Sequence, residues 1–453
     1  MKEVLLDLGS LSFPLKIPDQ TDIFSMKKVS LLAHPEEKIR HALESPIDSV
    51  PLKNLVFQKL RAKPHAKAVV VISDNTRPVP YSGESGILFP VIEKMIKAGL
   101  RPNQIRLLIA TGTHRPMSEK ELRKMLDPRI FALGLQIINH NSRSKRDLVS
   151  VGKTELGGKI FLNRYYMESD IKILTGLVES HFMAGASGGR KSICPGLLAE
   201  SSTYLLHSGP VLSSSKAADL ILDGNPVHEE ALRVARIAGC DMIVNATLDS
   251  SYRLTGVFAG DMENAHLAAV EKLRSYAGIP VDKKYDLVIG HTGFVGVNHY
   301  QAAKGALTCV PLIKNKGICI LAAFHTDPDP IGSSNYKNMI KLLTEMDAKK
   351  FMNMIVDPSW TFLPDQWEAQ MWARLFLKIP PENLIYCTLE IPDNSFSWIP
   401  ATDARTLAPK AKSLQELVEK SLSWALKRLH SCLGKEPQVA FLSDGPYGIP
   451  LTE

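Results

Sequence analysis

The stretch AVVVISDNTRPVPYSGESGILFPVIEKMIKAGLRPNQIRLLIATGTHRP (68–116) decides the fold class. It opens with the continuous β-branched run AVVVIS (68–73), which is typical of a strand buried on both faces. GILFPVIEKMIKAGL (86–100) has the spacing of an amphipathic helix, and IRLLIATGTH (105–114) returns to the strand pattern. A strand, a helix and a second strand in this order predict a βαβ unit with parallel strands.

The same alternation continues along the chain. DIKILTGLVESH (170–181) and MIVNATL (242–248) predict further strands, and DGNPVHEEALRVARIAGC (223–240) predicts a helix. In that helix Asn225 is expected to be the N-cap and Pro226 the first helical residue. The segment 257–279 is expected to form a turn followed by a long helix.

A boundary is predicted where AGIPVDKKYDLVIG (277–290) ends this helix at Gly and Pro and opens a new strand. Beyond it, 317–324, 384–392 and 438–445 predict strands separated by helices. The sequence therefore predicts an α/β protein of two domains, 1–276 and 285–453, each with a mostly parallel sheet flanked by helices.

Composition describes an ordinary globular protein: 453 residues, 45% hydrophobic and 22% charged. The net charge of +7 is not gathered into one basic run, which argues against a nucleic-acid partner and suits small anions. With neither a long apolar run nor the pattern of a signal peptide, we expect no membrane partner and a cytoplasmic location. The six cysteines form no CxxC pair and are expected to be buried thiols.

Polar residues follow four of the predicted strands. Asp74 and Arg77 come after 68–73, and His114 follows the next strand; HFMAGASGGRKS begins at His181, and HTGFVGVNHYQAAK follows 285–290. Because ligands of parallel sheets bind beyond the carboxyl ends of the strands, these residues are the candidates for a site. A single histidine in such a place is more often structural, and convergence of several on one edge favours function.

The segment HFMAGASGGRKSICPG (181–196) is the most informative one. Its glycines allow the backbone to approach a ligand closely and to present amides to an anion. The spacing is neither that of a Walker A loop nor that of GxGxxG, so the loop by itself indicates anion binding or simply a turn. Lys191, beside Arg190, is a candidate nucleophile, and His207 is a candidate base or metal ligand.

Together these motifs resemble the lactate racemase family, whose members use a nickel-pincer nucleotide to invert C2 of 2-hydroxy acids. The resemblance spans nearly the whole chain and is carried, in order, by SDNTRPVP (73–80), ATGTHRP (110–116), ESHFMAGASGGRKSICPG (179–196), His207, GNPVHEE (224–230), YQAAK (300–304) and WEAQ (367–370). It implies two α/β domains with the active site in the cleft between them.

The resemblance also implies the cofactor and its ligands. Lys191 would be joined by a thioamide to a pyridinium-3-thioamide-5-thiocarboxylic acid mononucleotide that binds nickel through one carbon and two sulfurs, and His207 would be the remaining nickel ligand. The backbone from Gly188 and Gly189 through Arg190 to Ser192 would cradle the cofactor phosphate. Cofactor-synthesis proteins are the partners that this implies.

For the reaction, the resemblance implies that the cofactor takes hydride from C2 while His114 or His181 takes the hydroxyl proton. Arg77, Tyr300, Gln301 and Lys304 would bind the substrate, Trp367 would line its pocket, and Asp74 would orient Arg77 or contact the cofactor. Trp367 alternatively fits the buried face of an amphipathic helix. Three histidines are not expected to be catalytic, namely His228, His291 and His299.

Three alternatives stay open at this stage. One is the same chemistry on malate or on an aromatic or sugar acid. The second is a protein that carries the nucleotide without turnover, against which the two histidines argue. The third is a lysine Schiff base with pyridoxal phosphate, for which the usual partner residues are not evident.

Overall fold

The computed structural model describes residues 1–154 and 157–452. Contacts divide the chain into two compact units. The N-terminal unit consists of Lys28–His207 and Ser214–Ser275, and the C-terminal unit consists of Met1–Lys27, Ser208–Ser213 and the chain from Tyr276 onward. This division differs from the contiguous domains expected from the sequence, because the first 27 residues and Ser208–Ser213 belong with the C-terminal half.

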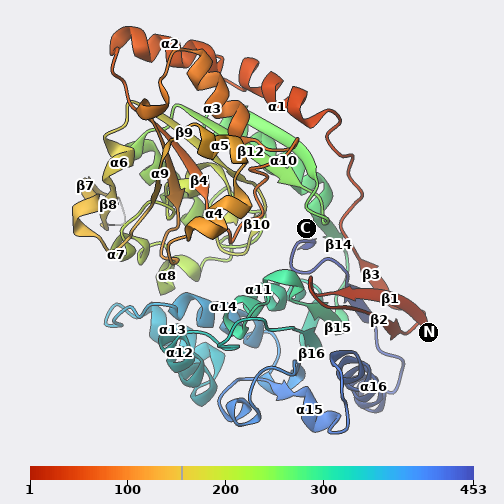
Figure 1. Ribbon diagram of the computed structural model, residues 1–453. Helices are drawn as coiled ribbons and strands as arrows, with labels where there is room; N and C mark the ends of the chain where they lie inside the picture. The colour runs from red at the N-terminus through yellow and green to blue at the C-terminus, as the bar shows by residue number, and fades with distance from the viewer. Residues whose placement is uncertain (155–156, 453) are drawn as a thin grey trace. The chain divides into compact units, whose positions relative to one another are not determined.

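The N-terminal unit is built on a six-stranded sheet with the order β13-β12-β9-β4-β5-β6 (Figure 1). Its strands are β4 (Ala68–Ser73), β5 (Ile105–Ala110), β6 (Gln136–Asn139), β9 (Ile171–Leu177), β12 (Met242–Leu248) and β13 (Leu254–Gly260). Neighbours from β12 to β6 are parallel, and β13 is antiparallel to β12. One prediction is wrong here. Val257–Gly260 were expected to belong to a turn, but they lie in β13.

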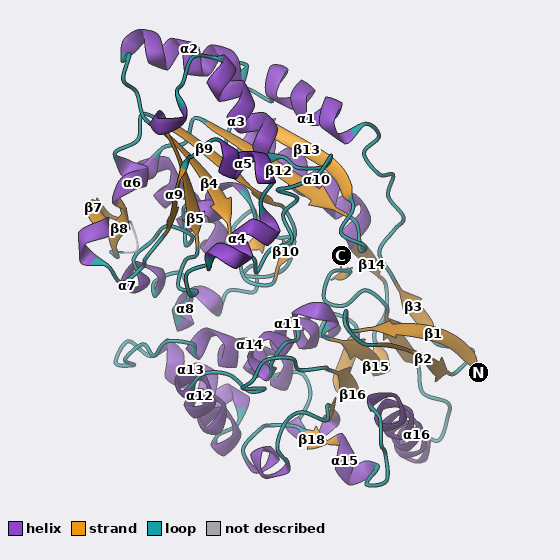
Figure 2. Ribbon diagram, viewed as in Figure 1, coloured by secondary structure: helices purple, strands orange, loops and turns teal. Residues whose placement is uncertain are grey.

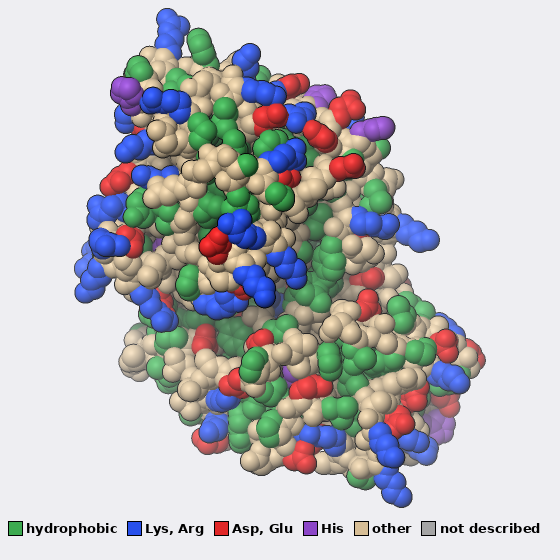
Figure 3. Space-filling view, in the orientation of Figure 1, with side chains coloured by type: hydrophobic (Ala, Val, Ile, Leu, Met, Phe, Trp, Pro, Cys, Tyr) green, Lys and Arg blue, Asp and Glu red, His purple; other side chains and the backbone are tan. Residues whose placement is uncertain are grey.

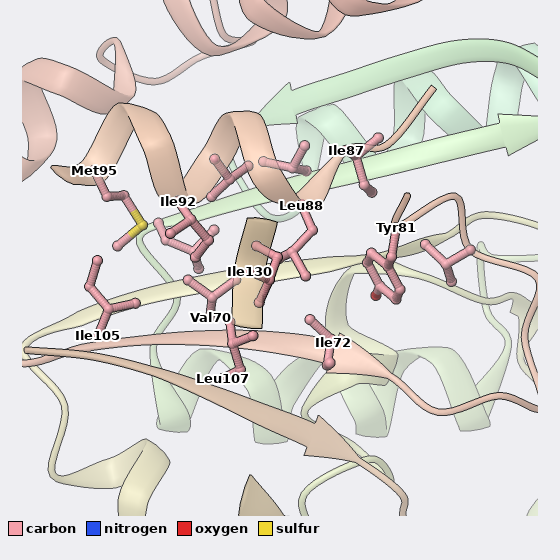
Figure 4. Close-up of a cluster of buried hydrophobic side chains, with 14 of the residues drawn as sticks. Val70, Ile72, Tyr81, Ile87, Leu88, Ile92, Met95, Ile105, Leu107 and Ile130 are labelled. Carbon is pink, nitrogen blue, oxygen red and sulfur yellow. The ribbon is translucent and has the colours of Figure 1, made fainter. Parts of the chain in front are cut away.

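Helices flank this sheet. They are α1 (Pro35–Glu44), α2 (Leu52–Ala62), α3 (Leu88–Lys97), α4 (Glu119–Met125), α5 (Pro128–Ala132), α6 (Arg164–Met167), α7 (Glu200–Thr203), α9 (Pro226–Ala238) and α10 (Asn264–Ala277). Figure 4 shows how α3 packs on the sheet: Leu88 and Ile92 point toward Ile72 and Val70 of β4, and Met95 points toward Ile105 of β5. The apolar spacing of the helix therefore buries the face that the sequence predicts.

Asn225 caps α9 as predicted, since its side chain accepts hydrogen bonds from the amides of Val227 and His228. Two small antiparallel pairs complete the unit, namely β7 (Leu148–Lys153) with β8 (Lys159–Asn163) and β10 (Ser180–His181) with β11 (Gly185–Ala186).

The C-terminal unit has a second six-stranded sheet, β18-β17-β16-β15-β19-β3, in which every neighbouring pair is parallel (Figure 2). Its strands are β3 (Asp22–Phe24), β15 (Tyr285–His291), β16 (Ile313–Ala322), β17 (Leu384–Cys387), β18 (Thr402–Asp403) and β19 (Val439–Leu442). Its helices are α8 (Gly209–Leu212), α11 (His299–Cys309), α12 (Ser334–Glu345), α13 (Ala348–Val356), α14 (Gln366–Phe376), α15 (Ala404–Leu407) and α16 (Leu414–Leu433). Two sheets of mostly parallel strands flanked by helices confirm the predicted α/β class.

Four further strands of this unit lie outside the main sheet. β1 (Lys2–Asp7) and β2 (Ser12–Ile17) form an antiparallel hairpin, and β14 (Gly278–Val281) pairs with β20 (Ile449–Thr452). Helix α10 ends at Ala277, where the Gly and Pro that follow were expected to end it, and Gly278–Val281 then form a short strand because they pair with Ile449–Thr452.

The surface carries both signs of charge. On the face drawn in Figure 3, Lys and Arg side chains are scattered among Asp and Glu rather than gathered into one patch. Among the residues that the structure describes, no helix combines the length and the apolar character needed to span a bilayer.

Candidate functional site

The carboxyl edge of the N-terminal sheet brings most of the predicted residues together. Strands β9, β4 and β5 are adjacent and parallel, and their ends are in register, with Ser73 opposite Ala110 and Val71 opposite Leu174. The polar segments after these three strands therefore emerge side by side, as expected for a ligand site in a parallel sheet.

Asp74 and His114 form a hydrogen-bonded pair at this edge. His114 Nδ1 lies 2.7 Å from Asp74 Oδ2. Burial by itself would raise the pKa of Asp74, but the hydrogen bonds from His114 and Thr76 outweigh it and lower the pKa below its ordinary value. The ionised carboxylate makes Nδ1 the protonated nitrogen of a neutral His114, so that its lone pair lies on Nε2. This arrangement suits a general base, and the charge of Arg77 also contributes to the low pKa of Asp74.

His181 has the opposite arrangement. Its Nδ1 accepts hydrogen bonds from the backbone amides of Met183 (3.3 Å) and Ala184 (3.2 Å). Because both amides donate, Nδ1 carries no proton, and the proton of the neutral ring lies on Nε2. In these hydrogen-bond arrangements Nε2 of His181 is a donor, whereas Nε2 of His114 is an acceptor.

Arg77 pairs with a carboxylate that the sequence did not single out. Its Nε lies 2.9 Å from Glu179 Oε1, and both side chains are about one quarter exposed (26% and 24%). Glu179 follows β9, so this ion pair joins the segments after β4 and β9. It holds the guanidinium at the sheet edge, where Arg77 is predicted to bind substrate.

The glycine loop has the conformation that its glycines permit. Gly188 and Gly189 have φ of 76° and 51°, in the region that side chains disfavour. The Gly189 amide donates to Asn245 Oδ1 at 2.8 Å, and a Cβ on Gly188 would lie 3.0 Å from the same oxygen. Asn245, on β12, therefore holds the loop closely against the sheet.

Lys191 and Ser192 follow in a single 3-10 turn, Gly189–Ser192. The Lys191 amide donates to the Gly188 carbonyl at 3.0 Å, and the Lys191 carbonyl accepts from Gly196 at 3.2 Å. The Lys191 side chain is partly exposed, whereas Ser192 is buried. The lysine is thus presented by a backbone that is hydrogen-bonded on both sides.

Arg190 does not extend toward solvent. It is 1% exposed, and its guanidinium donates to the Ala184 carbonyl at 2.8 Å and contacts His266 Nε2 at 3.0 Å. Burial lowers its pKa to about 9. The guanidinium of Arg190 therefore lies beneath the loop whose backbone is predicted to cradle the phosphate.

Burial lowers the pKa of His207 to about 4, so the imidazole is neutral at pH 7. The charge of nearby Lys191 contributes to the same shift. Its Nδ1 lies 2.9 Å from the Thr203 carbonyl oxygen, which puts the proton on Nδ1 and the lone pair on Nε2. A carbonyl that orients an imidazole in this way is the usual outer partner of a metal-binding histidine.

The other four predicted residues lie in the C-terminal unit. Tyr300, Gln301 and Lys304 are on α11, and Trp367 is on α14. Trp367 Nε1 donates to the Tyr300 hydroxyl at 2.6 Å, so the two aromatic residues are joined. Trp367 is half-buried at the start of its helix. Its hydrogen bond to Tyr300 is a polar contact that the alternative, packing on an apolar helix face, does not include.

Glu368 follows Trp367 and is 2% exposed. Burial raises its pKa to about 8, against the opposing charge of Lys304, which lies close enough to lower it. A buried carboxyl beside the predicted substrate-binding lysine was not foreseen from the sequence.

Four polar residues at these sites were missed by sequence reasoning: Glu179, Asn245, His266 and Glu368. Glu179 and Glu368 lie within motifs that carry the resemblance but were given no role, and Asn245 is a polar residue inside the buried run MIVNATL. Nothing in the sequence around His266 distinguishes it. Among residues 1–154 and 157–452, no group of three or more His, Cys, Asp and Glu side chains is placed to hold a metal ion.

Two family models match the chain. Residues 8–219 match the lactate racemase N-terminal domain, and residues 282–446 match the lactate racemase C-terminal domain. The chain is 32% identical over 345 residues to lactate racemase of Lactiplantibacillus plantarum, covering 76% of this chain and 78% of that protein. It is 28% identical to lactate racemase of Thermoanaerobacterium thermosaccharolyticum over 98% of both chains.

A solved structure resembles the whole chain. The lactate racemase apoprotein from Thermoanaerobacterium thermosaccharolyticum superposes with a TM-score of 0.82 at 27% identity, covering 100% of both chains.

Proposed function

Because this chain belongs to the lactate racemase family and is an isomerase, we propose that it inverts C2 of lactate or of a closely related 2-hydroxy acid. The observation that carries the proposal is the pair of hydrogen-bond arrangements at Nδ1 of its two candidate catalytic histidines. Asp74 leaves the lone pair of His114 on Nε2, and two backbone amides leave the proton of His181 on Nε2.

These two nitrogens suit opposite roles, one as acceptor and one as donor, toward the hydroxyl group of a hydroxy acid. In the state described, His114 takes the hydroxyl proton, and the resulting imidazolium is stabilised by the Asp74 carboxylate. His181 donates a hydrogen bond to the substrate oxygen. For the opposite enantiomer the two histidines exchange these roles, which requires the His181 ring to release the amides of Met183 and Ala184.

The residues of the N-terminal unit fit the nickel-pincer nucleotide. His207 is a neutral imidazole with its lone pair on Nε2, the form that binds a metal, and the loop at Gly188 and Gly189 permits close approach of a phosphate. Lys191, between these groups, would be the point of covalent attachment. When bound, this cofactor supplies the acceptor and donor of the C2 hydride.

Substrate binding is assigned to cations and hydroxyls that recognise a carboxylate. Arg77 is held by Glu179, and the Tyr300 hydroxyl is held by Trp367. Together with Gln301 and Lys304, these groups would orient the acid so that C2 faces the cofactor. Proteins that synthesise and attach the nucleotide are the partners that this proposal requires.

The test is mass spectrometry of the Lys191 peptide, with nickel analysis, on protein produced together with the cofactor-synthesis enzymes. We expect Lys191 to carry the added mass and the protein to hold about one nickel per chain. Lys191→Ala is expected to lose the modification and to stop racemising single-enantiomer lactate in a polarimeter. An unmodified Lys191 without nickel, or a racemising Lys191→Ala variant, contradicts the proposal.

The substrate is decided by a panel of single enantiomers of lactate, malate, an aromatic 2-hydroxy acid and a sugar acid. The highest kcat/KM is expected for lactate. A higher kcat/KM for a larger acid would keep the proposed reaction but show that the larger acid, not lactate, is the substrate.

A further inference from the structure

The imidazole of His266 lies directly beneath the glycine loop. His266 is on α10, far from the loop in sequence, and is 2% exposed. A Cβ built on Gly189 would lie 3.0 Å from both Cγ and Cδ2 of this ring. The ring thus occupies the space that any side chain at position 189 would need, and it supports the backbone where φ is 51°.

Polar contacts join the same ring to the loop on both sides of Gly189. With its proton on Nε2, His266 donates to the Ser187 carbonyl at 2.9 Å. Arg190 Nη1 lies 3.0 Å from the same nitrogen and donates to the Gly188 carbonyl at 3.5 Å. Arg190 in turn donates to the Ala184 carbonyl through Nη2. Two buried side chains therefore tie down a continuous piece of backbone, from Ala184 to Arg190, immediately before Lys191.

Burying these groups is costly, which argues that they do more than fill space. Arg190 is 1% exposed, and its Nε has no hydrogen-bond partner among the described residues. An apolar ring and an aliphatic chain of similar volume would fill the same space without this desolvation cost. What apolar groups would not provide is directional bonding to the loop carbonyls, which selects one loop conformation.

We propose that His266 is a positioning residue for Lys191: with Arg190 it fixes the backbone at 184–190 and thereby sets where the lysine is presented for attachment of the cofactor. This inference rests on the proposed function for its consequence at Lys191. Its structural part, the ordering of the loop, stands on the contacts of His266 alone.

The experiment uses His266→Phe, which keeps a ring of similar shape and removes both ring nitrogens. Its matched control is His291→Phe, because His291 is equally buried (2% exposed) and also places Nε2 against a backbone carbonyl, that of Ser443, at 2.8 Å. His291 lies in the C-terminal unit and is not part of the proposed catalytic set. His266→Gln is the conservative variant, since its amide keeps a donor and an acceptor.

The first readout is hydrogen exchange of the full-length protein without cofactor. We expect His266→Phe to raise the exchange rates of amides 185–192 by about tenfold or more, with β4 and β9 unchanged, and His291→Phe to leave this loop as in the wild type. His266→Gln is expected to lie between His266→Phe and the wild type. Wild-type exchange in the loop of His266→Phe would overturn the proposal; if that variant does not fold, wild-type exchange in His266→Leu, which also lacks both ring nitrogens, overturns it.

The second readout is the modified fraction of Lys191 after production with the cofactor-synthesis enzymes. We expect a several-fold lower fraction in His266→Phe and no change in His291→Phe. An equal fraction in all three proteins would overturn the link to Lys191. If wild-type Lys191 itself is unmodified, the proposed function fails, while the exchange rates still decide whether His266 positions the loop.

Discussion

At the scale of single residues, the protonation of His114 depends on one neighbour. The Asp74 carboxylate, 4% exposed, accepts from Nδ1 and so determines which nitrogen faces the substrate. Asp74→Asn keeps the size of the side chain, but its amide is able to donate to Nδ1 and to move the ring proton to Nε2. We expect kcat to fall by about 10² to 10⁴.

The rate is measured by polarimetry from each enantiomer of lactate. Since the two enantiomers have equal free energy in water, kcat/KM has to fall by the same factor in both directions. Asp127→Asn is the control, because Asp127 is a buried carboxylate of the same unit that pairs with Arg129. Wild-type kcat in Asp74→Asn would refute the base assignment of His114.

Glu368 makes a second residue-scale prediction, which concerns stability. Burial raises the pKa of Glu368 from an ordinary value of 4.5 to about 8 in the folded chain. Between these two values the folded chain binds more protons at this group than the unfolded chain, so rising pH lowers the free energy of unfolding. Glu368→Gln removes this contribution.

The measurement is urea unfolding of both proteins at pH 5, 6, 7 and 8. We expect the stability of Glu368→Gln relative to the wild type to increase with pH, by up to about 1.4 kcal/mol per unit. A difference that is constant across this range would show that Glu368 is ionised throughout.

At the scale of elements, local patterns predict those structures whose determinants are local. β4 forms at 68–73 because its run of β-branched residues is buried on both faces, and α9 begins at Pro226 because Asn225 caps it. Val257–Gly260 were misread because Gly and Asp at 260 and 261 resemble a turn, whereas pairing with β12 makes them a strand. Pairing partners outside the segment are not visible in its own periodicity.

The cap of α9 predicts a large effect for one substitution. Asn225 is fully buried, accepts from two helix amides and donates through Nδ2 to the carbonyls of Met183 and Ile221. Asn225→Ala leaves these groups without partners, and we expect a loss of about 2–4 kcal/mol in the free energy of unfolding. Ser118→Ala, at the exposed cap of α4, is expected to lose only about 1 kcal/mol. Equal losses in urea titrations would contradict the role of Asn225 as the buried partner of two helix amides and two carbonyls.

At the scale of the whole molecule, the N-terminal segment belongs to a sheet formed by the other end of the chain. β3 pairs with β19, and the β1–β2 hairpin places Leu6, Phe13 and Leu15 in the core formed with β15 and α16. The short strand at 22–24 was not predicted, because the partner strand that holds it follows more than 400 residues later. Sequence reasoning identified the polar segments after β4, β5, β9 and β15, since each comes directly after its own strand, but it did not find this long-range pairing.

This pairing predicts how fragments of the C-terminal unit behave. A fragment of residues 276–453 lacks β3 and the hairpin, so the apolar face of the sheet and the edge of β19 are left uncovered. The backbone amide of Lys27 donates to the Tyr276 carbonyl at 2.9 Å, and a short Gly-Ser linker therefore suffices to join 1–27 to 276–453. We expect the joined fragment to be monomeric with a cooperative urea transition, and the shorter one to aggregate and to bind a hydrophobic dye.

Phe13→Ala and Leu15→Ala in the joined fragment are expected to lower the urea concentration at its unfolding midpoint, because both side chains are buried, at 7% and 0% exposed. If 276–453 alone unfolds as cooperatively as the joined fragment, the N-terminal segment is not part of this folding unit.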